Sequence, residues 1–389
     1  MFIKNIAKLS VLLLLLNQQF SSAQTNSTNS QGARDNGQEA NSASTKTDTV
    51  ISFNKKTLLY ANEKHLRNVK QLTFGGDNAE AYFSFNGQYL TYQAHVPKWN
   101  VECDQVYLLN WKKQVATDSI IPQQLSTGMG RTTCSYFLPG DTTILYASTH
   151  LADKACPAVP APRDDHKYVW PVYDSFDIFV ADLKGRLIKR LTDNPGYDAE
   201  GTVSPKGDKI VFTSMRSGDL ELWTMNIDGS NPVQVTNQLG YDGGAFFSPD
   251  GKRLVFRASR PKTEEDIATY KELLAQGLVM PTQMDLYTCN VDGSDLQKIT
   301  SMPNASWAPF FHPSGKKIIF ASNYKSKRGL PFNLYMINID GTGLEQLTYD
   351  GMFDAFPMFS PDGKKLVWSS NRNNNGTHET NLFIADWVE

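Results

Sequence analysis

From residue 66 onward, short runs of apolar and β-branched residues alternate with compact turn sequences. One such stretch reads FFSPDGKRLVF (residues 246–256), in which Pro249-Asp250-Gly251 separates two apolar runs. A Pro-Asp-Gly segment in this position predicts a tight turn between two strands. The same phrase returns near the C-terminus as FSPDGKKLVW (359–368). The pattern therefore predicts a β-hairpin that is used more than once.

The hairpin occurs six times, and each copy belongs to a longer unit. Its turns begin at equivalent positions, namely Ser84, Leu138, Ser204, Ser248, His312 and Ser360. In every unit a further strand follows the hairpin, and five units continue with a short strand that ends in Leu-Thr or a similar dipeptide, as in EQLT (345–348). Unrelated hairpins in a β-sandwich would not keep this order. Four-stranded units in series predict the blades of a β-propeller.

The two ends of the repeat region indicate how the ring closes. The segment LRNVKQLT (66–73) has the pattern of a fourth strand, but no first three strands precede it. The last unit (355–387) has three strands and no fourth. Pairing the two would remove two open sheet edges. We predict an all-β fold, a six-bladed β-propeller of four-stranded blades whose last blade is closed by the N-terminal strand.

The repeat resembles that of a known family. The phrases FSPDGK, ELWTMNIDGS and RLT are similar to the Pro-Asp-type, WD-like repeats of the TolB propeller. Longer phrases, such as GYDAEGTVSPKG and NASWAPFFHPSG, resemble exported TolB-like proteins, and the resemblance covers residues 66–387. It implies a propeller of the cell envelope that binds proteins or peptides. The chain departs from TolB in having no discernible N-terminal α/β domain.

The N-terminal residues predict export. Lys4 and Lys8 precede a short apolar run (9–16), and Ser21-Ser22-Ala23 supplies a cleavage site, so residues 1–23 are expected to be a signal peptide. Residues 24–50 are poor in large apolar side chains and predict a disordered linker. The propeller would occupy residues 51–389. We expect a periplasmic protein, with secretion as the alternative, that has neither a membrane span nor a lipid anchor.

The overall charge argues against one class of partner. The chain has 38 Lys and Arg against 40 Asp and Glu, a formal net charge of −2, and no basic run with interleaved aromatic residues. We therefore expect no nucleic-acid partner.

Two long insertions interrupt the repeat, at residues 149–175 and 259–283. The second contains KTEEDIATYKELLAQG (262–277), in which Thr263 suits a helix N-cap and Gly277 suits the position after the C-cap. This amphipathic segment predicts a helix. We expect the helix to cover the propeller rather than to bind a partner.

The face that carries these insertions is where a binding site is expected. Loops between the second and third strands and between blades emerge on the same face, and rigid strands hold them in place. Residues on these loops predict an acidic funnel for a cationic peptide segment or a metal ion: Glu80, Arg131, Asp198, Glu200, Asp242, Trp307 and Asp354. The alternative is that the carboxylates bond to backbone N–H groups of their own turns.

Histidine and cysteine provide further candidates. His95, His150 and His166 could ligate a metal, although no dense metal-binding motif is present. We expect no cofactor, with a divalent metal in the channel as the alternative. Three cysteines are expected on the loop face, and a disulfide is possible among Cys103, Cys134 and Cys156. Both Cys134–Cys156 and Cys103–Cys134 remain open, and Cys289 is expected to be a free, buried thiol.

No catalytic residues are assigned from the sequence. The chain has no Gly-x-Ser-x-Gly nucleophile motif. The expected function is a non-catalytic, TolB-like exported propeller, a monomer that binds an envelope protein or peptide segment or serves as a scaffold. One alternative is a metal-assisted polysaccharide lyase or hydrolase that uses the channel face, as in some propellers with similar repeats. Another is a non-catalytic subunit that partners a separately encoded peptidase.

Overall fold

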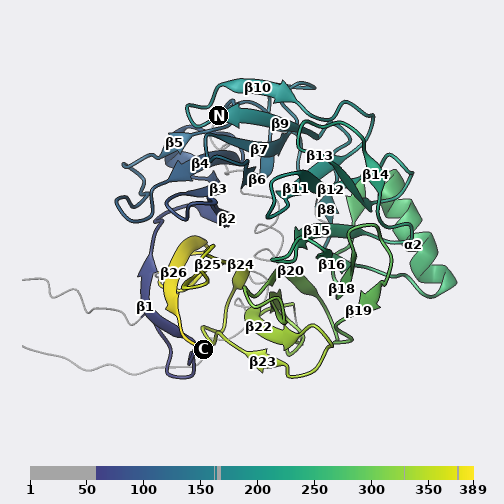
Figure 1. Ribbon diagram of the computed structural model, residues 1–389. Helices are drawn as coiled ribbons and strands as arrows, with labels where there is room; N and C mark the ends of the chain where they lie inside the picture. The colour runs from purple at the N-terminus through teal and green to yellow at the C-terminus, as the bar shows by residue number, and fades with distance from the viewer. Residues whose placement is uncertain (1–57, 162, 164–167, 328, 375) are drawn as a thin grey trace, which may run out of the picture.

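The computed structural model describes residues 58–161, 163, 168–327, 329–374 and 376–389. The expected signal peptide (1–23) and linker (24–50) lie outside these residues. The described chain forms six four-stranded antiparallel sheets arranged as blades around a central channel (Figure 1). The expected all-β, six-bladed propeller is confirmed.

Each blade contributes one innermost strand to the channel wall. In the order of blades 1 to 6, these are β2 (Asp77–Phe83), β6 (Thr132–Phe137), β11 (Asp198–Val203), β15 (Asp242–Phe247), β20 (Ser306–Phe311) and β24 (Asp354–Phe359). The second strands are β3 (Leu90–His95), β7 (Thr143–Ser148), β12 (Lys209–Ser214), β16 (Arg253–Ala258), β21 (Lys317–Ser322) and β25 (Lys365–Ser370).

The third strands lie further from the channel and the fourth strands at the rim. The third strands are β4 (Gln105–Leu109), β9 (Asp177–Asp182), β13 (Glu221–Asn226), β18 (Asp285–Asn290), β22 (Asn333–Asn338) and β26 (Asn381–Trp387). The fourth strands are β5 (Gln123–Gln124), β10 (Leu187–Arg190), β14 (Val233–Gln234), β19 (Gln297–Lys298), β23 (Glu345–Gln346) and, for blade 6, β1 (Leu66–Gln71).

The ring closes as expected. Strand β1 pairs antiparallel with β26, and Leu66 lies opposite Trp387. The N-terminal strand thereby supplies the fourth strand of blade 6. The edges of β1 and β26, which would otherwise be open, pair with each other.

The repeated hairpin turn is held by its own side chains. In blade 4, Ser248 Oγ donates to Asp250 Oδ1 (2.7 Å) and accepts the Arg253 N–H (2.9 Å). Gly251 has a φ of 72°, a conformation that glycine adopts at little cost. The Pro-Asp-Gly sequence therefore has a structural role, which is to stabilise the hairpin turn.

The Leu-Thr dipeptide at the end of each unit also has a structural cause. In blade 2, Thr192 Oγ1 accepts the N–H of Ile178 on the third strand (2.9 Å) and donates to Asp177 (3.2 Å). The other five blades repeat the N–H contact with a Ser or Thr hydroxyl, in the pairs Val106–Ser126, Leu222–Thr236, Leu286–Thr300, Leu334–Thr348 and Leu382–Thr73. The hydroxyl thus satisfies a buried backbone donor where the short fourth strand ends.

The two insertions meet each other. Strand β8 (Trp170–Pro171), from the first insertion, pairs antiparallel with β17 (Leu278–Val279), from the second. The second insertion also forms the expected helix, α2 (Glu264–Ala275), with Thr263 as its N-cap and a capping box to Asp266. Figure 1 places α2 at the periphery of the ring, so the helix covers the side of the propeller and not the channel.

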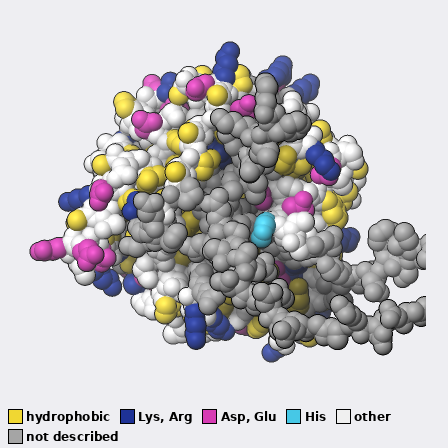
Figure 2. Space-filling view, turned by 180° about the vertical axis from the view of Figure 1, so that it is seen from behind, with side chains coloured by type: hydrophobic (Ala, Val, Ile, Leu, Met, Phe, Trp, Pro, Cys, Tyr) yellow, Lys and Arg dark blue, Asp and Glu magenta, His cyan; other side chains and the backbone are white. Residues whose placement is uncertain are grey.

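The remaining features are a short helical turn, the distribution of charge on one face and the length of the helices. A short 3-10 helix, η1 (Pro97–Trp99), follows β3. On the face seen from behind, Lys and Arg side chains are interspersed with Asp and Glu around the rim (Figure 2), as the small net charge suggests. Within the described residues, no helix is long and apolar enough to cross a membrane.

Candidate functional site

Every innermost strand bends at the same point. A register shift interrupts its pairing with the second strand, and the residue at that bulge has a positive φ between 44° and 59° or, for the one glycine, 60°. We call these six residues the bulge ring: Glu80, Cys134, Glu200, Gly244, Ala308 and Phe356. All six line a single cavity in the channel. A β-bulge changes the direction of a side chain, and here it directs one residue of each blade into the channel.

A second ring, two residues further along each strand, closes the channel. Its members are Tyr82, Tyr136, Thr202, Phe246, Phe310 and Met358. Their aromatic rings contact one another, with centroid distances of 5.7 Å for Tyr82–Phe246 and 5.1 Å for Phe246–Phe310. The channel is therefore divided into two cavities.

The two cavities differ in character. The loop-side cavity, of about 150 Å³, contains the bulge ring and lies toward the insertions. The turn-side cavity, of about 320 Å³, is lined by phenylalanines and by Pro205, Pro249, Pro313 and Pro361 of the hairpin turns. Ionisable side chains are found on the loop-side walls, which makes that cavity the candidate binding site.

Aromatic side chains wall the loop-side cavity. Trp170, from β8, lies 5.9 Å from Tyr241 and 5.7 Å from Trp307 between ring centroids. Trp307 Nε1 also donates to the carbonyl of Pro281 in the second insertion (3.3 Å). The insertions thus place a tryptophan beside the mouth of the channel.

Glu200 is the most fully bonded member of the bulge ring. Its carboxylate forms an ion pair with Arg257 of the next blade and accepts from Tyr241 Oη (2.8 Å), Thr213 Oγ1 (2.7 Å) and the Gly244 N–H (2.9 Å). Burial alone would raise the pKa of Glu200, but Arg257 and these donors outweigh burial and lower it. A side chain at position 244 would collide with the Arg257 guanidinium, which explains the glycine there.

Glu80 occupies the same position in blade 1 with far fewer partners. It is 8% exposed and accepts hydrogen bonds from Tyr82 Oη (3.1 Å) and from the Cys134 thiol. Among the described residues, no Lys or Arg forms an ion pair with it. Burial and the Glu200 carboxylate raise the pKa of Glu80, and Arg257, which is paired with Glu200, offsets this only in part.

Arg131 lines the cavity next to the disulfide. It pairs with buried Asp104, and its Nη2 lies 3.5 Å from Cys156 Sγ. Cys103 and Cys156 form a disulfide that joins the loops of blades 1 and 2, a third combination beside the two pairings left open from the sequence. Cys134 is instead a free thiol in the channel wall, and Cys289 is free and buried. Burial and the nearby carboxylates raise the pKa of the Cys134 thiol.

Three of the proposed funnel residues lie outside the cavity. Asp198, Asp242 and Asp354 each begin an innermost strand and pair with an arginine just beyond the second strand of the same blade, Arg216, Arg260 and Arg372 respectively. In a regular strand, residues 198 and 200 would face the same side. The bulge breaks this alternation, so that Glu200 enters the channel while Asp198 stays inside its blade.

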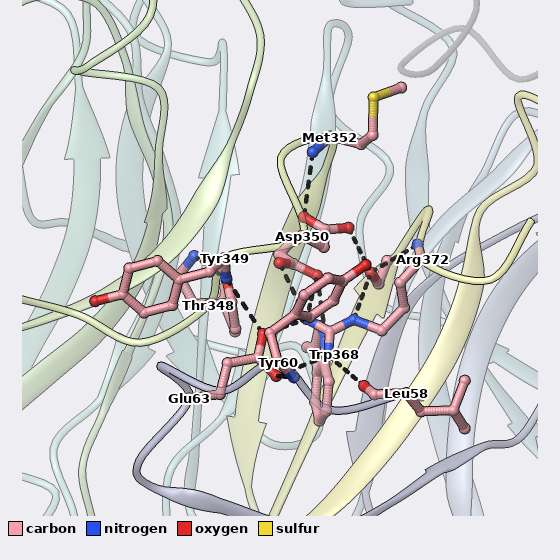
Figure 3. A network of polar contacts seen from close by, with 12 residues as sticks. Leu58, Tyr60, Glu63, Thr348, Tyr349, Asp350, Met352, Trp368 and Arg372 are labelled. Carbon is pink, nitrogen blue, oxygen red and sulfur yellow. Dashed lines mark hydrogen bonds and ion pairs between the residues drawn. The ribbon is translucent and has the colours of Figure 1, made fainter. Parts of the chain in front are cut away.

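The Asp354 pair belongs to a network that anchors the N-terminal segment (Figure 3). Arg372 donates to Glu63 (3.0 and 3.2 Å), to the carbonyl of Leu58 (2.9 Å) and to Asp354 (3.3 Å), and its guanidinium lies over the Tyr60 ring. Asp350 lies beside this network, where burial and the Asp354 carboxylate raise its pKa to about 8.

The histidines do not assemble into a metal site within the described chain. His95 and His150 are buried, and burial lowers the pKa of both. His150 Nδ1 contacts Ser148 Oγ (2.8 Å). His166 lies outside the described residues. The part of the chain that the structure describes contains no group of three His, Cys, Asp or Glu side chains suited to a metal ion.

The channel therefore brings together Glu80, Arg131, Glu200 and Trp307 of the expected residues. It adds Arg257, Tyr241 and Trp170, which sequence reasoning missed. Arg257 could have been noticed as a charged residue within the apolar strand RLVFRA. Trp170 gave no such signal, because its place depends on the pairing of two distant insertions.

Comparisons with known proteins agree with this architecture. The family model described as the TolB beta propeller domain matches residues 169–280. A curated protein of Agrobacterium fabrum, Atu1656, is 36% identical over 56 residues, which are 14% of this chain and 19% of that protein. The matched segment thus spans about a fifth of that relative's length.

A solved structure of low sequence identity shows the same fold. The putative TolB from Agrobacterium tumefaciens superposes with a TM-score of 0.51 at 19% identity and covers 81% of this chain and 91% of its own. An oligogalacturonate lyase in complex with manganese gives a TM-score of 0.44 at 17% identity over 81% of this chain and 90% of its own. Residues 169–280 carry TolB-type repeats, and the described chain has the fold of a TolB-like β-propeller.

Proposed function

We propose that this protein is an exported β-propeller that binds a protein or peptide segment of the cell envelope in the loop-side cavity, without catalysing a reaction. The observation that carries the proposal is the cavity itself, which is walled by aromatic side chains, lined by ionisable groups and placed where the interblade loops and insertions converge. Concave sites of this composition are the usual location of ligands. The TolB-like fold supports a protein or peptide as the partner.

The state of the ionisable groups favours binding over catalysis. Glu200 is neutralised by Arg257, and Arg131 by Asp104. Cys134 is the thiol in the bulge ring, and its raised pKa disfavours the thiolate that a nucleophile requires. These groups form an electrostatically balanced wall around Glu80.

The proposed compartment is the periplasm. The signal-peptide pattern of residues 1–23 supports export. The Cys103–Cys156 disulfide is typical of a protein that folds in an oxidising compartment.

Affinity capture tests this function. The protein, purified after export, is immobilised and exposed to envelope extract of its own host, beside two variants. Ala308→Arg places a long side chain in the bulge ring, whereas Lys252→Glu changes an exposed residue of a hairpin turn on the opposite face. We expect wild type and Lys252→Glu to retain the same partner and Ala308→Arg to lose it.

The opposite results would refute the proposal. If Ala308→Arg captured the partner as well as wild type, the cavity would not be the site. If the purified protein depolymerised oligogalacturonate or another acidic glycan, the non-catalytic assignment would be wrong.

A further inference from the structure

The internal repeat allows the two glutamates of the bulge ring to be compared position by position. Glu80 in blade 1 and Glu200 in blade 3 both occupy the bulge. Glu200 receives three of its partners from the following blade: the guanidinium of Arg257, the hydroxyl of Tyr241 and the N–H of Gly244. Blade 2 follows blade 1 in the ring, so its residues at the same three positions are the counterparts for Glu80.

Strand register identifies these positions. Arg257 lies opposite Gly243, the residue before the bulge, and in blade 2 the residue opposite Thr133 is Ala147. Ala147 therefore takes the place of Arg257. By the same register, Arg131 takes the place of Tyr241 and Cys134 that of Gly244. Arg131 is engaged with Asp104, so that Cys134 alone of the three bonds to Glu80.

Glu80 is thus a buried carboxylate whose blade interface lacks the cation that its counterpart has. It is 8% exposed, and the groups that donate hydrogen bonds to it, Tyr82 Oη and the Cys134 thiol, are neutral. A buried carboxylate is costly unless a positive group compensates it. Glu80 lines the loop-side cavity together with Gln93, Thr133 and Cys134 of the same interface, so a group entering the cavity can reach this part of its wall.

Arg257 shows how a cation fits this channel. Its guanidinium carbon lies 5.5 Å from the Trp170 ring centroid and 5.1 Å from that of Tyr241 while it pairs with Glu200. Aromatic faces stabilise cations at such distances. On the Glu80 side, the neighbouring rings are Tyr82 and Tyr136, whose centroids are 5.6 Å apart.

We propose that Glu80 binds the positively charged end of a lysine or arginine side chain of the ligand peptide, which takes the place at blade 1 that Arg257 takes at blade 3. The proposal rests on the proposed function, because it assigns a subsite within the same cavity. Recognition of the peptide in the channel then depends on its cationic side chain.

Small probes test the subsite without knowledge of the partner. Nα-acetyl-lysine amide carries one ammonium group, and Nα-acetyl-norleucine amide has a similar shape without the charge. Titration calorimetry on the full protein is expected to show at least tenfold tighter binding of the lysine probe. Glu80→Gln is expected to weaken lysine-probe binding at least tenfold and to leave norleucine-probe binding unchanged. Glu102→Gln, an exposed residue of a nearby loop, removes the same charge and is expected to bind like wild type.

A second variant supplies the cation internally. Ala147→Arg places a guanidinium at the position equivalent to Arg257, where it can pair with Glu80, and is expected to abolish lysine-probe binding. If this variant fails to fold, as judged by its circular dichroism and thermal transition, Glu80→Gln alone decides the question.

The outcomes separate this inference from the proposed function. Equal binding of the two probes, no binding of either, or unchanged lysine-probe binding by Glu80→Gln would overturn the cation subsite. If Glu80→Gln still captured the envelope partner while Ala308→Arg lost it, the cavity would stand as the binding site and the subsite would fail. If the lysine probe bound through Glu80 but no partner were captured, the subsite would stand and the proposed partner would fail.

Discussion

Strand β11 carries two carboxylates two positions apart that have different roles. Asp198 is fully buried and pairs with Arg216 of its own blade. Glu200 lies in the channel and pairs with Arg257 of the next blade. The bulge at Glu200 makes the difference, because it turns the Glu200 side chain into the channel and leaves that of Asp198 in the sheet.

The same contrast extends around the ring. Aspartates at the strand starts pair with arginine in blades 3, 4 and 6, in each case within one blade, which indicates a scaffold interaction. The bulge ring, in contrast, differs from blade to blade, with two glutamates, a cysteine, a glycine, an alanine and a phenylalanine. Repeated positions thus maintain the scaffold, and the position that varies gives the channel its chemistry.

The largest expected effect comes from breaking a strand-start pair. Arg372→Ala leaves Glu63 and Asp354 buried without their counter-charge, and we expect a loss of about 3–5 kcal/mol in the free energy of unfolding. Urea denaturation followed by tryptophan fluorescence measures it. The control is Arg186→Ala, whose side chain is 78% exposed and pairs with Asp182, with an expected loss below about 1 kcal/mol. Equal losses in the two variants would contradict a scaffold role for Arg372.

The two glutamates of the bulge ring should respond differently to the same substitution. Glu200→Gln leaves Arg257 without its carboxylate, and we expect a loss of about 2–3 kcal/mol. Glu80→Gln removes a charge that forms no ion pair with a basic residue of the described chain, so its unfolding free energy should fall by less than about 1 kcal/mol or rise. Paired denaturation curves test this, and a larger loss for Glu80→Gln would reverse the comparison.

The network around Arg372 should also make stability depend on pH. The folded-state pKa of Asp350 is about 8, above its ordinary value of 3.8, so the folded protein holds a proton that the unfolded chain has released. The stability that this proton contributes is fully present below pH 4 and is lost as the pH rises through about 8. We therefore expect the free energy of unfolding to decline steadily across that window.

Asp350→Asn provides the matching control, because the amide stays neutral throughout. Its unfolding free energy, measured at several pH values between 4 and 9, should decline less than that of wild type, and the variant should be the more stable of the two at pH 9. Parallel curves for the two proteins would show that Asp350 does not titrate in this way.

A smaller effect is expected at the repeated hydroxyl contact. Thr236→Val removes the oxygen that accepts the Leu222 N–H (2.9 Å) and donates to Glu221 (2.5 Å), and we expect a loss of about 1–2 kcal/mol. Thr342→Val, in an exposed turn, should cost no more than about 0.5 kcal/mol. Thermal denaturation of the two variants compares them, and an unchanged midpoint for Thr236→Val would exclude the proposed role of the Leu-Thr dipeptide.

The fold was largely predictable from the sequence because its signals are local. The six blades were predicted from the turn phrases and strand patterns. Their closure was predicted from the extra strand-like segment at residues 66–73, and α2 from its capping residues. The hydrogen bond of the Leu-Thr hydroxyl was not predictable, because the backbone N–H that the hydroxyl accepts belongs to a neighbouring strand.

The site was predictable only in part, for a geometric reason. Glu80 and Glu200 were expected in the channel, but Asp198 was expected there as well, and only the bulge separates them. Arg257 was missed because it lies in a second strand, away from the loops. Trp170 reaches the channel through the pairing of β8 with β17, two segments far apart in the sequence that carry no shared signal.

Site-specific photo-crosslinking in the living host tests whether the loop-side cavity holds the partner. Benzoylphenylalanine replaces Phe356 of the bulge ring in one strain and Phe310, which lines the turn-side cavity, in another. We expect the probe at 356 to crosslink to an envelope protein or peptide and the probe at 310 not to do so. Crosslinks from position 310 alone, or none from position 356, would contradict a binding site in the loop-side cavity.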